Sequence, residues 1–144
     1  YNNYWVLIFS YPENSYTSDY RQEVLDLVNV ERAKYGLQPL VMGDANLTAA
    51  AQKRAEEIAT VNSHTRPDGT KCFAVLNEYG VKDAPTGENA AWGSVSPEEV
   101  VKAWMNSEGH RANILDPEAR KMGVGYYYNS SSAWGHQWIQ IFTK

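Results

Sequence analysis

Cysteine, long apolar runs and clustered basic residues are nearly or wholly missing from this sequence. Cys72 is the single cysteine among 144 residues, so no intrachain disulfide can form. The net charge is −4 and no run of basic residues occurs. A nucleic-acid partner requires a concentrated positive patch, so we exclude that class. The apolar run Trp5–Phe9 falls well short of the roughly 20 residues of a membrane span, and it lacks the basic flank and cleavage site of a signal peptide.

The local motifs of common enzymes and metal sites are also absent. The sequence contains no His-Glu-x-x-His, no paired Cys-x-x-Cys, no EF-hand loop and no Gly-x-Ser-x-Gly elbow. Gly123-Val124-Gly125 is a weak match to a phosphate loop, because it lies in a strand-like segment. Cys72 has apolar neighbours and no activating group nearby in sequence, which favours a buried packing residue over a nucleophile.

The length and the hydrophobic periodicity predict one α+β domain. We divide the chain into an N-terminal extension, residues 1–17, and a domain of residues 18–144, large enough to bury a core without disulfides. Capping and periodicity predict helices that begin at Asp19, Asp44 and Ser96, and a short helix over 71–79. We expect strands over 88–92, 121–128 and 133–142, the last two forming an antiparallel hairpin. Helices followed by a terminal hairpin indicate a layered α+β or α/β/α arrangement.

Three polar clusters, residues 63–69, 86–93 and 107–115, provide candidate site residues. Our hypothesis is that His64, Glu88 and His110 converge on one pocket. Imidazole and carboxylate groups serve both as ligands of divalent metals and as general acids and bases. Isolated histidines are also common as surface or core residues, so spacing alone leaves that alternative open. Glu88 enters an apolar strand, and a buried carboxylate requires a histidine, arginine or metal partner.

The remaining candidates lie in the C-terminal hairpin. His136 alternates with apolar residues, which favours a solvent-facing position on the strand. The aromatic residues of this region could line a lipid or carbohydrate groove, although sheet packing with a few exposed faces is the favoured interpretation. These aromatic residues are Tyr126, Tyr127, Tyr128, Trp134 and Trp138.

Taken together, the motifs resemble those of the CAP superfamily of cysteine-rich secretory, antigen 5 and pathogenesis-related proteins. The motifs are, in chain order, Leu27-Val28-Asn29-Val30-Glu31-Arg32-Ala33, Gly36-Leu37-x-Pro39-Leu40, Ser63-His64, Gly87-Glu88-Asn89, Trp104-Met105-Asn106-Ser107-x-Gly109-His110-Arg111-x-Asn113-Ile114-Leu115 and Gly123-Val124-Gly125 with Trp138 and Phe142. The resemblance covers residues 18–143. This chain lacks the cysteines of the eukaryotic members, and in this it resembles the short bacterial branch of that family, the SCP-domain type.

The resemblance implies a three-layer α-β-α sandwich with a small, mainly antiparallel sheet, and a central cleft with two histidines and two glutamates. His64, Glu88 and His110 match three of these residues and are the expected metal ligands, with zinc the expected ion. The second glutamate falls on Ser107, and Glu108 lies one position further on. Four polar residues are then expected to hold loops by hydrogen bonds: Asn29, Arg32, Asn89 and Arg111.

The resemblance also implies export, either to the exterior or to the cell envelope. The favoured hypothesis is a monomeric, non-enzymatic binding domain whose cleft takes a divalent cation. Its ligand would be a small molecule, a lipid or a component of the envelope. One alternative is a metal-assisted peptidase or esterase in which Glu88 is the general base. Another is lipid or sterol binding.

Overall fold

The computed structural model describes residues 13–144, and within α1 it describes side chains from Tyr20 onward. The helices are α1 (Glu13–Lys34), α2 (Ala45–Glu57), α3 (Ala74–Glu78), α4 (Pro97–Met105) and α5 (Glu108–Ile114). The strands are β2 (Val41–Met42), β3 (Pro85–Trp92), β4 (Lys121–Tyr128) and β5 (His136–Thr143). The apolar run at residues 5–9, and the short strand considered for the extension, lie outside the described residues.

The predicted starts of α2 and α4 are confirmed, and a side chain caps each of these helices. The Asp44 carboxylate accepts a hydrogen bond from the amide of Leu47 at the start of α2. Ser96 caps α4 in the same way by accepting from the amide of Glu99, with Pro97 in the first helical turn. The first helix starts earlier than predicted, at Glu13 rather than Asp19, and therefore within the segment assigned to the extension.

The sheet has four strands in the order β2-β4-β5-β3, so β3 is an edge strand. β5 pairs antiparallel with both β3 and β4, which confirms the hairpin and the mainly antiparallel sheet. β2 was not predicted, because Pro39 and Gly43 indicated a loop. It adds two residues, Val41 and Met42, parallel to β4, so the sheet is mixed.

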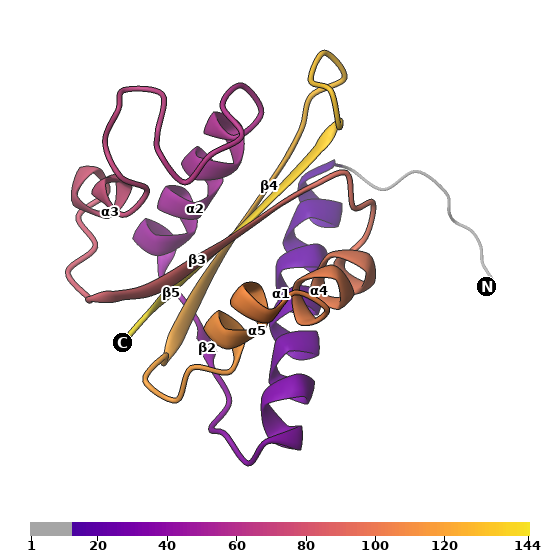
Figure 1. Cartoon of the computed structure of the whole chain (residues 1–144), viewed down its shortest axis with the longest axis vertical. Coiled ribbons are helices and arrows are strands. Elements are labelled where there is room, and N and C mark those ends of the chain that lie inside the picture. Colours follow the sequence, from indigo (N-terminus) through magenta and orange to yellow (C-terminus); the bar gives the residue numbers. More distant parts are fainter. Residues whose placement is uncertain (1–12) are drawn as a thin grey trace.

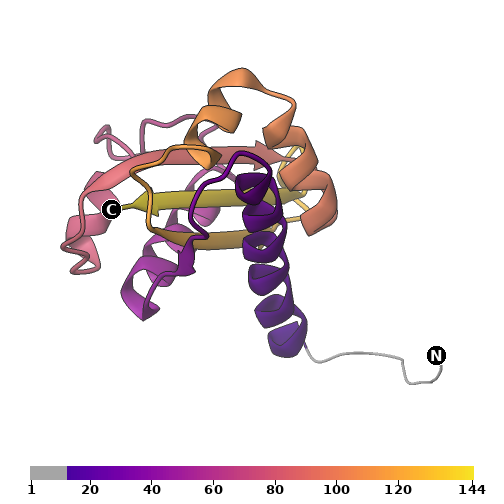
Figure 2. The same ribbon diagram turned by 90° about the horizontal axis from the view of Figure 1, so that it is seen from below.

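Helices cover both faces of the sheet: α2 and α3 lie on one side of the overlapping strands, and α1, α4 and α5 lie on the other (Figure 1). Figure 2, turned by 90°, shows the strands side by side. Alternate residues of β5 point to opposite cores. Trp138 and Phe142 pack with α1 and α4, whereas Ile139 and Ile141 pack with α2 and α3. The result is the predicted α-β-α sandwich, with a core on each side of the sheet.

Small residues let α2 lie very close to the sheet. A Cβ placed on Gly125 of β4 would lie 2.2 Å from the carbonyl oxygen of Ala51 in α2. Ala50, Ala51 and Ala55 face the sheet and are fully buried. The Gly123-Val124-Gly125 pattern is therefore a packing feature of β4 and not a phosphate loop. Within residues 13–144, no helix has both the length and the apolarity to cross a membrane.

Candidate functional site at the edge strand

The edge strand β3 directs successive side chains to opposite faces of the sheet, and both faces contribute to the site. Glu88 faces α2, as does the next even-numbered residue, Ala90, which belongs to the α2 core. Asn89 faces the other side, where its amide donates to the carbonyl of His110 in α5, 3.0 Å away. Residues from both helical layers therefore meet at this strand.

Glu88 is buried, with its side chain 1% exposed, and both carboxylate oxygens accept hydrogen bonds. Arg54 of α2 donates through Nε to Oε2 at 2.8 Å and through Nη2 to Oε1 at 3.1 Å. Nδ1 of His64 lies 2.7 Å from Oε1. Burial alone would raise the pKa of Glu88, but the hydrogen bonds from His64 and Arg54 outweigh it and hold the pKa below its ordinary value. The sequence predicted a histidine, an arginine or a metal as the partner of this carboxylate, and the structure shows both a histidine and an arginine.

Arg54 connects the site to a larger buried ion network. Its Nη1 donates to Glu57 at 2.9 Å, and its Nη2 donates to the carbonyl of Ser63 at 3.0 Å. Arg66 then bridges Glu57 and Glu78 with further hydrogen bonds. Because Arg54 and Arg66 hold both ends of the 63–66 segment, they fix the loop that carries His64.

His64 is exposed, unlike its partner. Its side chain is 58% exposed and comes from the loop between α2 and α3. The hydrogen bond to Glu88 raises its pKa above the ordinary value of 6.5, against the opposing effect of partial burial. The loop thus presents an imidazole to solvent while its Nδ1 is held on a buried carboxylate.

His110 comes from the opposite layer, in the first turns of α5. Its Nδ1 lies 2.9 Å from Oγ of Ser107, the residue that precedes the helix. Burial lowers the pKa of His110, and the charge of His64 lowers it further, so the two histidines interact electrostatically. At the position where the resemblance implied a second glutamate, Ser107 contacts His110, whereas Glu108 is exposed.

Asn89 and Asn113 hold α5 against β3. Asn113 donates to Oδ1 of Asn89 at 2.8 Å and to the carbonyl of Glu88 at 3.3 Å. The contact is close enough that a Cβ on Gly87 would lie 2.5 Å from Oδ1 of Asn113. Gly87 is therefore needed so that the helix carrying His110 can approach the strand carrying Glu88.

The other residues expected to hold loops also bond to the backbone. Asn29 exchanges two hydrogen bonds with the main chain of Leu40. Arg32 is fully buried and donates to the carbonyls of Gln38, Ile114 and Asp116. Arg111 donates to the carbonyl of Met105 at 3.4 Å. These contacts tie the segments on both sides of α5 to α1 and α4.

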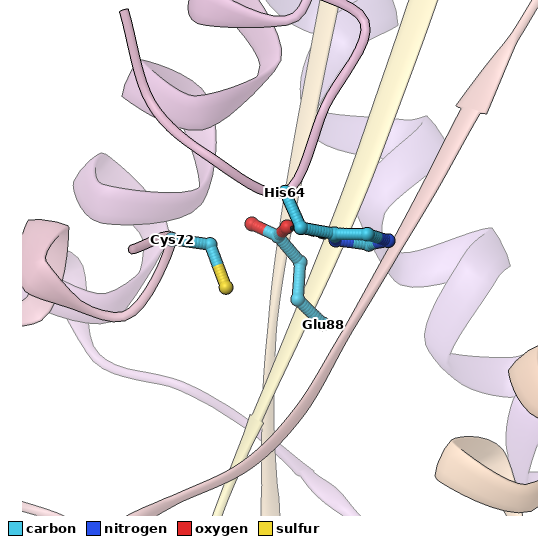
Figure 3. Close-up of side chains that lie close together, drawn as sticks. All are labelled: His64, Cys72 and Glu88. Carbon is cyan, nitrogen blue, oxygen red and sulfur yellow. Dashed lines mark hydrogen bonds and ion pairs between the residues drawn. The ribbon is translucent and has the colours of Figure 1, made fainter. Parts of the chain in front are cut away.

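Cys72 is the residue that sequence reasoning did not assign to the site. It is buried, as predicted, and burial raises the pKa of its thiol to about 11. The Glu88 carboxylate lies between the Cys72 thiol and the His64 ring (Figure 3). One ligand atom from each of the three lies within 4.8 Å of the others, so the group could hold a metal. The sequence did not predict this placement, because the neighbours of Cys72 in the chain are apolar. The thiol comes close to Glu88 only through the conformation of the 61–73 segment.

His136 occupies a different environment from the one predicted. It is half-buried and not solvent-facing, and its Nδ1 lies 2.6 Å from Oη of Tyr126. Its ring packs against those of Tyr126 and Tyr128. It lies on the hairpin, and the interactions described here do not connect it to His64 or His110.

Two features together identify the class of this protein. They are the layered α-β-α fold and the two histidines that reach one edge strand from separate segments. This chain belongs to the cysteine-rich secretory protein family, CAP, whose family model matches residues 25–142. It is 42% identical over 127 residues to YkwD of Bacillus subtilis (strain 168), an alignment that covers 87% of this chain and 49% of YkwD. The chain thus spans about half the length of that relative.

Solved structures show the same fold. An extracellular protein containing a SCP domain from Bacillus anthracis str. Ames superposes with a TM-score of 0.79 at 25% identity, covering 96% of this chain and 45% of that chain. An outer surface protein from Borrelia burgdorferi has a TM-score of 0.73 at 22% identity, covering 85% and 90% respectively. The fold is therefore that of bacterial CAP domains.

Proposed function

We propose that this domain is a non-enzymatic binding module that takes a divalent cation, zinc foremost, through Nε2 of His64 and Nε2 of His110. The observation that carries the proposal is that the Nδ1 atom of each ring already has a partner. Each Nδ1 is engaged, one with Glu88 and the other with Ser107. Within the described part of the chain, no hydrogen bond reaches either Nε2. A histidine whose Nδ1 is held in this way presents Nε2 to a metal.

Glu88 is then a positioning residue rather than a ligand, which modifies the set expected from the sequence. Both of its oxygens accept hydrogen bonds, and the Arg54 guanidinium lies 2.8 Å from one of them. That positive charge opposes a second cation at the carboxylate. The carboxylate instead orients His64 and increases its basicity, as carboxylates commonly do beside metal-bound histidines.

The group of His64, Cys72 and Glu88 is a less favourable set of metal ligands than the two histidines. A metal held by this group would have to displace the hydrogen bond between His64 and Glu88. It would also lie beside Arg54 and require ionisation of a thiol whose pKa is raised to about 11. The donor set made of two histidines needs neither change.

The hydrolase alternative is weaker on the same geometry. A bound metal would polarise a substrate oxygen or activate water. A general base works best with a pKa near the operating pH, whereas the pKa of Glu88 is lowered and its two oxygens are occupied. Glu88 is therefore poorly suited to accept a proton from water.

One observation favours a second candidate function, the binding of a lipid chain. A surface groove between α1 and α4 has four apolar lining residues, Leu27, Val30, Val101 and Met105, and four polar ones, Glu31, Glu98, Lys102 and Asn106, which is the arrangement that an amphipathic ligand would need. Displacement of a fluorescent fatty acid by unlabelled lipid would detect this activity. Replacing Val30, which is 54% exposed, with aspartate should abolish it while leaving zinc binding unchanged.

We further propose that the protein acts outside the cytoplasm, either at the exterior or at the cell envelope. The support is the family and the similarity to the Bacillus anthracis protein, which is an extracellular protein. We also propose that residues 18–144 form the CAP domain and that the protein is a monomer.

Zinc titration by calorimetry tests the metal site. His64→Ala and His110→Ala should each weaken binding at least tenfold, and Glu88→Gln should weaken it by about 10- to 100-fold through loss of orientation. His136→Ala, which removes the remaining histidine, is the matched control and should bind like the wild type. Cys72→Ser should also be unchanged. Loss of binding in Cys72→Ser with retention in His110→Ala would instead assign the metal to the cysteine group.

A further inference from the structure

Two large aromatic side chains are exposed at the tip of the β4–β5 hairpin. Tyr128 is 56% exposed and Trp134 is 58% exposed, whereas Trp138 on the same hairpin is 2% exposed. The tip extends beyond the helices at one end of the molecule (Figure 1). Sheet packing therefore accounts for Trp138 but leaves Tyr128 and Trp134 without a partner in the core.

Each exposed ring lies close to a glycine. A Cβ on Gly135 would lie 3.2 Å from Cε1 of Tyr128, and one on Gly93 would lie 3.8 Å from Cε3 of Trp134. Both glycines have positive φ, 75° and 92° respectively. Tyr128 also packs against the ring of His136, with centroids 4.9 Å apart. Tyr128 is thus in contact with a neighbouring ring, and Trp134 lies at van der Waals distance from the position of a Cβ on Gly93.

This end of the molecule carries no Asp, Glu, Lys or Arg over two segments that meet there. Residues 122–143 and residues 89–97 contain none. The segments are joined by the indole of Trp138, which donates to the carbonyl of Ser94 at 2.8 Å. By contrast Tyr35, exposed at 61% on another part of the surface, directly follows Lys34.

Neutral polar groups surround the aromatic rings. Ser130 and Ser131 are exposed in the hairpin turn, and Asn129 is half-buried beside them. The Asn129 side chain accepts from the amide of Ser131 at 2.9 Å, which orders the turn. The turn therefore offers hydroxyl and amide groups close to Tyr128 in the chain and has no formal charge of its own. One carboxylate reaches the neighbouring 89–97 segment, because Glu99 accepts a hydrogen bond from the amide of Val95 at 3.0 Å.

We propose that this surface, defined by Tyr128, Asn129–Ser131 and Trp134, binds a neutral carbohydrate. A pyranose ring has one face of C–H groups that packs against the electron-rich face of an aromatic ring, and an edge of hydroxyls that bonds to serine and asparagine. The lack of charged side chains in residues 122–143 fits this ligand. Nucleic acid and anionic membrane surfaces would need lysine or arginine at the contact. The surface shares no residue with the proposed metal site, so this inference does not rest on the proposed metal function.

Two-dimensional ¹H–¹⁵N NMR with the full chain tests the proposal. The probes are chitotetraose and cellotetraose, two neutral oligosaccharides of β-linked pyranose rings. The Trp134 indole signal, assigned with Trp134→Phe, and the amides of residues 92–96 and 128–136 should shift with at least one probe. Trp134→Ala should weaken that binding at least tenfold, and Tyr128→Ala should also weaken it. Tyr35→Ala removes an equally exposed tyrosine from a charged region and should have no effect.

Three outcomes would overturn the inference. One is the absence of shifts at the tip with both oligosaccharides at millimolar concentration. Another is equal affinity in wild type and Trp134→Ala. The third is binding to phosphatidylcholine vesicles through Trp134 without any oligosaccharide binding, which would make the tip a membrane contact. Because Trp134 is exposed, its substitution leaves the fold intact, and the thermal midpoint of each variant checks this.

Discussion

At the scale of single residues, Glu88 shows how a buried carboxylate becomes stable. Removing a carboxylate from water costs several kcal/mol unless partners replace the hydration. Arg54 supplies two hydrogen bonds and His64 supplies one, so each oxygen has a partner. The stability of the site therefore depends on Arg54 as much as on the acid.

Arg54→Met should strongly destabilise the protein, because it leaves Glu88 and Glu57 buried without a common partner. Loss of one member of a buried ion pair costs about 3–5 kcal/mol. Urea unfolding would measure the free energy of unfolding. Lys34→Met is the matched control, since it breaks the exposed pair with Glu31 and should cost less than about 1 kcal/mol. Equal losses in both variants would contradict the argument.

The two site histidines should titrate on opposite sides of their ordinary value of 6.5 in the metal-free protein. The hydrogen bond to Glu88 raises the pKa of His64, whereas burial and the charge of His64 lower that of His110. NMR of the imidazole Cε1 protons would give both midpoints. Glu88→Gln should lower the midpoint of His64. A midpoint for His64 that does not change in this variant would remove the assigned cause.

These shifts have opposite consequences for stability. His64 binds its proton more tightly when folded, so its contribution is full below pH 6.5 and is lost as the pH rises through its folded pKa. His110 favours the neutral form when folded, so its contribution is present above 6.5 and is lost as the pH falls. His64→Gln should therefore reduce the loss of stability above neutrality.

At the scale of secondary-structure elements, the close contact between α2 and β4 is the sharpest packing constraint. Gly125→Ala would place a methyl group 2.2 Å from a backbone oxygen, which cannot move aside as a side chain can. Overpacking of this kind costs about 1–3 kcal/mol or more. Thermal and urea unfolding should show this loss.

Gly109→Ala, in α5, is the matched control for that substitution. Nothing lies within 4 Å of the added Cβ, and the position is helical and exposed. Alanine is favoured over glycine in a helix by about 1 kcal/mol, so this variant should be as stable as the wild type or slightly more stable. A similar loss in both variants would show that contact with α2 is not the cause.

At the scale of the whole molecule, metal binding and folding are linked. A ligand that binds only the folded state at one hundred times its Kd adds about 2.7 kcal/mol. For a chain of this size that corresponds to a rise of about 5–10 °C in Tm. Calorimetric scans with zinc should show such a rise for the wild type and for His136→Ala, and none for the double variant His64→Ala/His110→Ala. A rise in the double variant would place zinc elsewhere.

Local sequence signals predicted the elements that depend on local physics. The Asp44 and Ser96 caps, the alanine stripe of α2 and the alternation of β4 and β5 are each readable within a few residues. The need for a partner at Glu88 also followed from the cost of burying a charge. Local signals missed β2, whose two residues pair with a strand about 80 positions later.

By itself the sequence determined the class of fold and named the residues that a site would use. The tertiary structure decided the role of each, because hydrogen-bond partners are set by approach between distant segments. Only the folded chain shows that Arg54 and His64 share the Glu88 carboxylate, that Ser107 holds His110, and that Cys72 lies beside them. It also shows that Trp134 faces solvent while Trp138 is buried, because the alternation of β5 directs Trp138 into the core whereas Trp134 lies in the turn before the strand.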